Sequence, residues 1–157
     1  MREQRRRPSP AVPSRPAGWV AATSFATEAA RIVDALGHMR LRVSLYVLRL
    51  EGLAAPAAAS LVEEELGEDA LVGRLPDRSL GLLLIDASAP SPEAQRALLA
   101  KRLAGRLARR GAPGGEIRIH VAERHGWSDE LEGVAHVVED MMDAPTIALP
   151  LRARLVG

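Results

Sequence analysis

The chain has 157 residues, of which 47% are apolar and 26% charged, and its formal net charge is +1. These values are ordinary for one globular domain with a proper core, and the balanced charge excludes a strong overall attraction to nucleic acid. The absence of cysteine from the sequence excludes a disulfide framework and thiolate metal sites.

Residues 1–18 are basic and rich in proline. Repeated prolines exclude a helix, and so polar a segment has nothing to bury, so we expect a disordered tail. Such a tail could bind acidic lipid, nucleic acid or a partner, but a solvated leader without a role is favoured, because tails of this kind are common at chain ends. No apolar h-region follows the basic N-terminus, so we expect no secretory signal. No apolar run approaches the length of a membrane span, and we therefore expect a cytoplasmic protein.

Two elements begin the ordered domain, which we place at residues 19–145. Residues 19–36 repeat apolar side chains at every third and fourth position, the spacing of an amphipathic helix. Residues 41–50 follow as a strand. Because both of its faces are largely apolar, this strand is expected inside a sheet.

A second helix, residues 56–66, leads into a hairpin of two strands at about 70–75 and 80–86. Pro76 and Asp77 between these strands have turn chemistry, since proline fixes φ and a short acidic side chain bonds its own backbone. The second strand of the hairpin is almost continuously apolar. It is therefore expected in a central position as well.

The C-terminal third predicts a helix, a strand and a last helix. The run Ser91-Pro92-Glu93 begins the first of these, because a hydroxyl cap, a proline in the first turn and an acid near the positive end favour a helix start. Residues 116–122 alternate polar and apolar side chains, which fits a strand near the sheet edge. Ser128 is expected to cap the last helix, and residues 146–157 form a C-terminal extension that could add an edge strand or lie loose.

The order of elements over residues 41–122 is strand, helix, strand, strand, helix, strand. Right-handed crossovers place both helices on one face of a four-stranded antiparallel sheet, with the two most apolar strands in its centre. The sequence thus predicts an α+β fold with the ferredoxin-like β-α-β-β-α-β plan, extended by one added helix at each terminus.

Two segments can be compared with a known family. The first strand ends Leu48-Arg49-Leu50-Glu51, and the hairpin turn reads Arg74-Leu75-Pro76-Asp77-Arg78-Ser79-Leu80. With the order and lengths of the elements, these segments resemble the GGDEF domain of bacterial diguanylate cyclases, which is related in fold to the class III nucleotide cyclases. The resemblance covers about residues 22–143.

The resemblance implies that the catalytic positions are lost. In the family the first strand ends in Asp-x-Asp, whose first carboxylate helps to hold magnesium. Here Arg49 takes that place and repels the ion, and Glu51 alone is a weak ligand. The family hairpin reads Arg-Tyr-Gly-Gly-Asp-Glu-Phe, but here proline and aspartate replace the glycines, and arginine and serine replace the acids. The vestigial active-site positions are Arg49, Glu51, Arg74, Pro76, Asp77, Arg78 and Ser79.

Two-metal phosphoryl transfer needs at least two placed carboxylates, so we expect no catalysis, no metal and no cofactor. The leading hypothesis is a degenerate GGDEF-like domain that serves as a protein-interaction or regulatory module in bacterial signalling. Its protein partner is unidentified, and a homodimer is one option, since this family's enzymes work as dimers. The alternative is a sensor that binds a nucleotide or another phosphate ligand in the vestigial cleft through Arg49, Arg74 and Arg78. An active diguanylate cyclase is least expected.

Two charged surfaces accompany this plan. Acidic residues cluster at positions 63–69, where a solvated helix face is favoured over divalent-ion binding. A basic stripe at helical spacing could contact phosphate or an acidic partner, although a plain soluble face is again favoured. The two surfaces could also pair between protomers. The residues of the basic stripe are Arg102, Arg106, Arg109 and Arg110.

The sequence does not favour a histidine metal site or an RNA-recognition module. The spacing of His120, His125 and His136 matches no metal motif, so surface or hydrogen-bonded histidines are favoured. RNA-recognition modules share the element order, but they need exposed aromatic side chains on the central strands, where this chain offers only Tyr46. We therefore expect no sequence-specific nucleic-acid binding.

Overall fold

A five-stranded antiparallel sheet and four helices make up the described part of the chain, residues 24–86, 90–109 and 117–149 of a computed structural model. The predicted tail, residues 1–18, and residues 150–157 lie outside the described residues. None of the described helices combines the length and the apolar character that crossing a membrane requires. In chain order the elements are α2 (Phe25–Ala35), β1 (Arg42–Glu51), α3 (Ala55–Leu66), β2 (Ala70–Arg74), β3 (Leu80–Ile85), α4 (Pro92–Arg109), β4 (Arg118–Trp127), α5 (Val134–Met142) and β5 (Ile147–Ala148).

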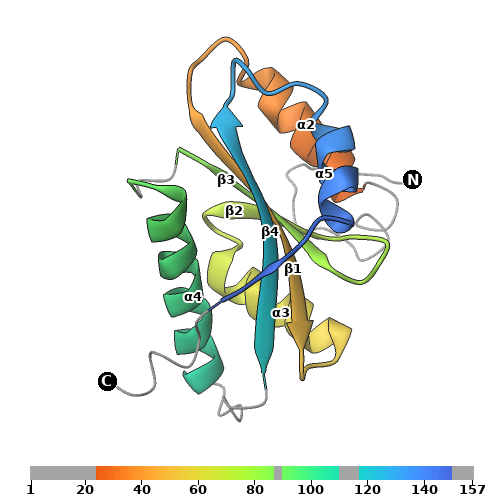
Figure 1. The fold of residues 1–157 in the computed structure, drawn as a ribbon, viewed down its shortest axis with the longest axis vertical. Coiled ribbons are helices and arrows are strands. Elements are labelled where there is room, and N and C mark those ends of the chain that lie inside the picture. The colour runs from red at the N-terminus through yellow and green to blue at the C-terminus, as the bar shows by residue number, and fades with distance from the viewer. Residues whose placement is uncertain (1–23, 87–89, 110–116, 150–157) are drawn as a thin grey trace, which may run out of the picture.

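The sheet has the strand order β2-β3-β1-β4-β5, and every neighbouring pair of strands is antiparallel (Figure 1). The two most apolar strands, β1 and β3, are interior, as their sequences predict. All ten residues of β1 pair with β4, and residues 43–48 are buried. The α+β prediction is confirmed, and the C-terminal extension contributes β5 as a short edge strand.

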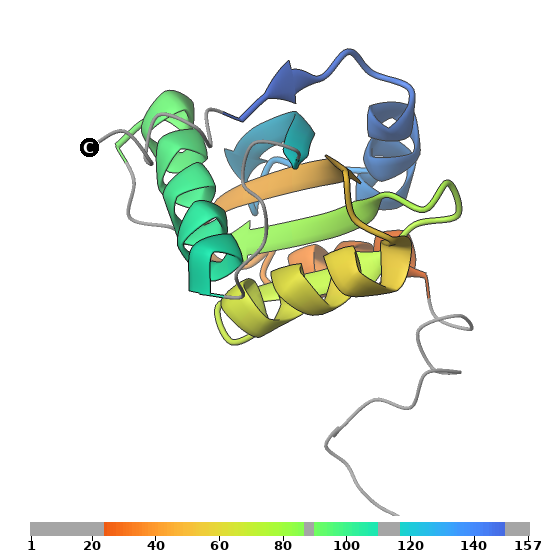
Figure 2. The same cartoon turned by 90° about the horizontal axis from the view of Figure 1, so that it is seen from below.

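Each face of the sheet carries a pair of helices, and β1 supplies alternate side chains to both faces. Tyr46 and Leu48 pack with α3 and α4 in a core that includes Leu61 and Leu103. Figure 2 shows these two helices side by side. Leu45 faces the other way, into the core beneath α2 and α5, which lie next to each other in Figure 1. The two helices that connect the first four strands therefore share one face, as expected.

Helix α2 begins at Phe25, six residues later than the predicted start at residue 19. Ser24 has an extended backbone, and its side chain accepts a hydrogen bond from the Thr27 N–H at 3.1 Å. This is the N-cap arrangement that satisfies a free donor of the first turn. Residues 19–23 lie outside the described residues.

Ser128 does not cap the last helix, so that prediction is wrong. Helix α5 begins at Val134, after Gly133, whose φ of 61° is in the left-handed region. The Ser128 hydroxyl instead donates to the Met39 carbonyl at 2.7 Å and accepts from the Leu41 N–H at 2.9 Å. β4 also continues to Trp127 instead of ending at residue 122, because β1 pairs with it along this length. Ser128 thereby closes the end of the β1–β4 pair.

Two glycines let α2 lie against the hairpin of β2 and β3. Gly73 and Gly81 face each other in the register of these strands, and Phe25 covers both. A Cβ atom at Gly81 would lie 2.3 Å from Cδ2 of Phe25, closer than real Cβ contacts allow. The phenyl ring therefore occupies the space that two side chains would otherwise fill.

Substitution of Gly81 should disturb this contact. We expect Gly81→Ala to lower the free energy of unfolding in urea by about 1–3 kcal/mol, since an added methyl group overpacks the core. Gly105→Ala on α4 is the matched control: its Cβ would have no neighbour nearer than 3.6 Å. That control should be neutral or stabilising by up to about 1 kcal/mol, because alanine favours helix. Equal stability of the two variants would contradict the packing described here.

Candidate functional site

The vestigial positions at the end of β1 and in the β2–β3 turn lie together. Nη1 of Arg49 is 2.8 Å from Oδ2 of Asp77, and Nη2 of Arg49 donates to the carbonyl of Met142 at the end of α5. A single guanidinium thus joins the end of β1, the hairpin turn and the last helix. The structure places positive charge where the GGDEF resemblance aligns a metal carboxylate.

The turn forms with the chemistry predicted from Pro76 and Asp77. The Leu75 N–H donates to the Ser79 carbonyl at 2.9 Å, and Arg78 adopts the left-handed φ of 73° that closes the turn. Oδ1 of Asp77 accepts from the Ser79 N–H at 3.1 Å and also from the Ser79 hydroxyl. Asp77 therefore bonds its own backbone two residues on.

Asp77 is held in its ionised form by this network. Partial burial raises the pKa of the Asp77 carboxyl, but the hydrogen bonds from Ser79, and then the hydrogen bond and charge of Arg49, outweigh it. The net effect is a pKa below the usual range. The carboxylate is thus already matched by donors of the protein itself.

The other vestigial positions point outward. Glu51, Arg74, Pro76 and Arg78 are all exposed. Oε2 of Glu51 lies 3.7 Å from Nε2 of His120, and its side chain is 64% exposed. Arg74 and Arg78 form no ion pair with the described residues. The structure therefore assembles three of the seven positions, Arg49, Asp77 and Ser79, into one network.

The predicted basic stripe on α4 pairs with the acidic cluster within the chain. Carboxylate oxygens of Glu65 on α3 lie 3.2, 3.1 and 3.1 Å from nitrogens of Arg102, Arg106 and Arg109. Arg102 also donates to the Glu65 carbonyl at 2.7 Å and to Asp69 at 3.0 Å. These candidate phosphate or partner contacts are thus occupied by α3, while Arg110 lies outside the described residues.

Glu65 is the centre of this arrangement, with a side chain only 13% exposed. Burial raises the pKa of its carboxyl, but the hydrogen bonds and charges of Arg102 and Arg106 have the larger combined effect and lower it. Glu65 therefore stays ionised and links α3 to α4.

The three histidines on β4 and α5 do not come together in one site. His120 faces Glu51, whereas His136 is 77% exposed on α5 and lies 3.8 Å from Glu139. His125 is mostly buried, and its Nδ1 is 2.9 Å from Oγ of Ser44. Among the described residues, no group of three or more His, Cys, Asp or Glu side chains is arranged to hold a metal ion.

Sequence reasoning missed a buried polar cluster near the start of β1. Ser44 and Gln95 are 1% and 5% exposed, and the Ser44 hydroxyl donates to Oε1 of Gln95 at 3.4 Å. His125 lies opposite Ser44 in the β1–β4 register, and its ring meets Tyr46 edge-on at 5.7 Å. A signal was present in the sequence, because Gln95 falls four residues before Leu99 in the apolar stripe of α4.

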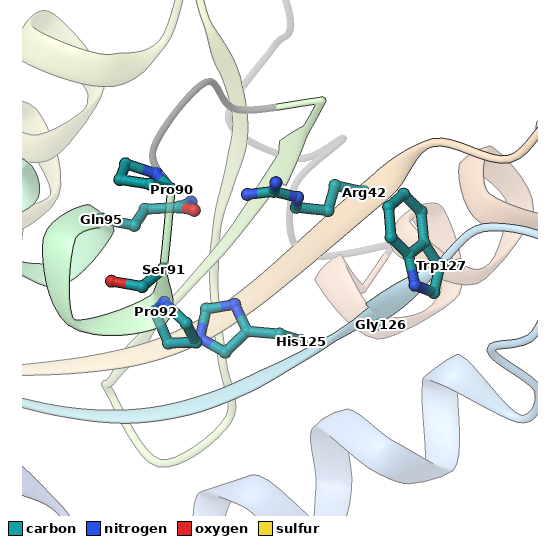
Figure 3. A pocket seen from close by; sticks show the side chains of 8 residues that line it. All are labelled: Arg42, Pro90, Ser91, Pro92, Gln95, His125, Gly126 and Trp127. Atoms are coloured by element: carbon teal, nitrogen blue, oxygen red, sulfur yellow. The ribbon is translucent and has the colours of Figure 1, made fainter.

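This cluster adjoins a cavity of about 280 Å³. Figure 3 shows the side chains of Arg42 and Gln95 pointing toward each other across it, from β1 and α4. The Ser91 hydroxyl caps α4 by accepting from the Ala94 N–H at 3.1 Å. The lining residues are Arg42, Pro90, Ser91, Pro92, Gln95, His125, Gly126 and Trp127.

Removing the charge of Glu65 should weaken the contact between α3 and α4. We expect Glu65→Gln to lower the free energy of unfolding at pH 7 by about 1–2 kcal/mol, since three partly screened pairs of up to about 1 kcal/mol each are lost. Because the folded-state pKa of Glu65 is depressed, its contribution is present above the unfolded-state pKa and is lost as pH falls through the folded value.

Urea denaturation over this acidic range checks the expectation. The stability difference between wild type and Glu65→Gln should disappear at low pH. Glu68→Gln, at an exposed acid just after α3, is the control and should change stability little. A difference between wild type and Glu65→Gln that is independent of pH would contradict the assignment.

Comparison with known proteins assigns the chain to no family. No protein-family model, curated protein or solved structure matches the chain. The resemblance to GGDEF domains therefore depends on the order of the elements and on the residues at the end of β1 and in the hairpin turn.

Proposed function

We propose that this chain is a cytoplasmic, non-catalytic GGDEF-like module that acts in bacterial signalling through protein contact. The observation that carries the proposal is the network of Arg49, Asp77 and the Met142 carbonyl. The strand order β2-β3-β1-β4 with α3 and α4 on one face supports the ferredoxin-like part of the proposal. Helices α2 and α5 correspond to the helices added at its two ends.

Electrostatics argues against nucleotide turnover at this position. Two-metal phosphoryl transfer requires carboxylates that neutralise the ions and the developing charge. A guanidinium about 4 Å from a divalent ion would oppose its binding by several kcal/mol, even with the effective dielectric constant of a protein surface. The carboxylate of Asp77, which pairs with Arg49, also accepts a hydrogen bond from the Ser79 hydroxyl. Its acceptor positions are therefore already used within the chain. We therefore assign the domain a role in protein contact and not in catalysis.

A second copy of the chain is the first partner to test, since the enzymes of the resembled family work as dimers. We expect the purified chain to sediment as a concentration-dependent dimer and to release no pyrophosphate or cyclic di-GMP from GTP with Mg²⁺ or Mn²⁺. Sedimentation velocity over a concentration series and chromatography of the nucleotides are the measurements.

The matched variants Glu51→Gln and Asp77→Asn separate activity of the chain from contamination. Turnover that either variant abolishes would overturn the non-catalytic assignment. Turnover that both variants retain belongs to a contaminant. A chain that stays monomeric over the whole concentration series would contradict self-association.

A sensor of phosphate ligands in the same cleft is the second candidate. It is favoured by the exposure of Arg74 and Arg78 on the hairpin. Arg78 follows Asp77 in the turn, but Arg74 pairs with Leu80 on the face of α3 and α4, and a ligand would compete with Asp77 for Arg49. On this alternative, calorimetry with GTP and cyclic di-GMP should show binding that Arg78→Ala weakens. Arg124→Ala, an exposed arginine on β4, is the control and should bind as wild type does. No heat with either nucleotide would eliminate the candidate.

A further inference from the structure

Strand β2 forms one edge of the sheet, and among the described residues its only neighbouring strand is β3. No residue of β2 is fully buried, although Ala70, Leu71 and Val72 are apolar. Ala70 and Val72 pack against the core beneath α3 and α4, and Leu71 packs against the core beneath α2 and α5. Both cores therefore end at this strand with apolar side chains that are only partly covered.

The hairpin turn determines which backbone groups of β2 point away from the sheet. The Leu75 N–H donates to the Ser79 carbonyl, so these two residues form a hydrogen-bonded pair of the antiparallel ladder. Because such pairs alternate with non-bonded ones, Gly73 also bonds β3, and every second residue of β2 directs its N–H and C=O groups outward. The outward residues are Ala70, Val72 and Arg74. No backbone hydrogen bond from another described segment reaches them.

A second copy of the same strand satisfies all of these outward groups. With an antiparallel partner and a two-fold axis at Val72, this residue faces its own counterpart, and Ala70 faces Arg74 of the second copy. Each outward residue then donates one hydrogen bond and accepts another. A shift of two residues in either direction would leave an outward residue of each strand without a partner.

The charges near the edge fit the same register. Arg74 and Glu68 are both exposed, and neither forms an ion pair within the described residues. Arg74 would face Ala70 of the second copy, which Glu68 precedes by only two residues, and diagonal neighbours at this spacing are within reach of long side chains. The two-fold axis therefore brings opposite charges together twice, and the strand pair sets no like charges directly opposite each other.

The two edges of the sheet differ in how they are protected. Native proteins commonly guard an edge with proline, with charge or with a very short strand. The opposite edge ends in β5, which has two residues. β2 has five residues, contains no proline and carries Arg74 as its one charge, so it is the edge that can accept a strand.

We propose that β2 pairs with β2 of a second copy of this chain, so that two sheets continue as one across a two-fold axis. The inference names the surface for the self-association proposed above and rests on that proposed function. Pairing at this edge also covers the apolar side chains at which both cores end.

Hydrogen exchange of single backbone amides, followed by NMR in a dilution series of the full chain, tests the register. We expect the amide protons of Ala70, Val72 and Arg74 to exchange at least about tenfold more slowly in the dimer than in the monomer. Those of Leu71 and Gly73 should be protected at every concentration, because they bond β3. Protection of Val72 that does not change with concentration would overturn the inference, since the edge would then be covered within a single chain.

Val72→Pro removes the central donor of the strand pair and leaves the ladder with β3 intact, because proline is tolerated where the N–H faces outward. We expect this variant to keep the circular dichroism spectrum of the wild type and to raise the dissociation constant of the dimer at least about tenfold. Sedimentation velocity is the measurement. Val72→Thr, which keeps both the N–H and the branched side chain, is the matched control and should associate as wild type does.

Charge reversal tests the same contact without a change to the backbone. Arg74→Glu should weaken the dimer, because it brings like charges together across the axis, and the double variant Arg74→Glu/Glu68→Arg should restore it. A dimer that Val72→Pro and Arg74→Glu both leave intact would overturn the β2 contact and leave the proposed self-association standing. A chain that is monomeric at every concentration would overturn both, whereas nucleotide turnover tests the non-catalytic assignment separately.

Discussion

Strand β1 is the element on which the rest of the structure depends. Its interior position gives it hydrogen-bonded neighbours on both sides, and its side chains enter the two cores in turn. A shift of one residue in its register would exchange these faces and turn Ser44 toward the apolar core beneath α2 and α5. The same alternation serves the two candidate sites, since Arg42 reaches the cavity and Arg49 reaches the hairpin turn and α5.

The parts of the fold that could be predicted from the sequence depend on local chemistry. The Pro76-Asp77 turn forms because a proline and a short acid have the required backbone preferences in themselves. β3 is interior because its run of apolar residues is stable only when both faces are covered. The prediction that Ser128 caps a helix was wrong because its hydroxyl forms hydrogen bonds with Met39 and Leu41, which lie far away in the chain.

For the candidate sites, too, local features could be predicted from the sequence, whereas contacts between distant residues could not. The GGDEF resemblance placed the end of β1 beside the hairpin turn, but it could not show that Arg49 and Asp77 bind each other. The basic stripe on α4 was visible as charge, yet Glu65, its partner, precedes Arg102 by 37 residues. The cavity could not be predicted from the sequence, because residues that line it come together only when β1 pairs with β4. Only Gln95, an amide in a stripe of leucines, indicated it in advance.

The hydrogen-bond chain through Ser44, Gln95 and His125 restricts how this sequence can drift during evolution. Each member supplies a partner for another, so a single replacement leaves polar atoms stranded in the interior, whereas a concerted change to apolar residues of similar shape leaves none. In related chains these three positions are therefore expected to covary as a set. They stay polar where the cavity is inherited and become apolar where it is filled, which gives homologues a signature readable without any structure.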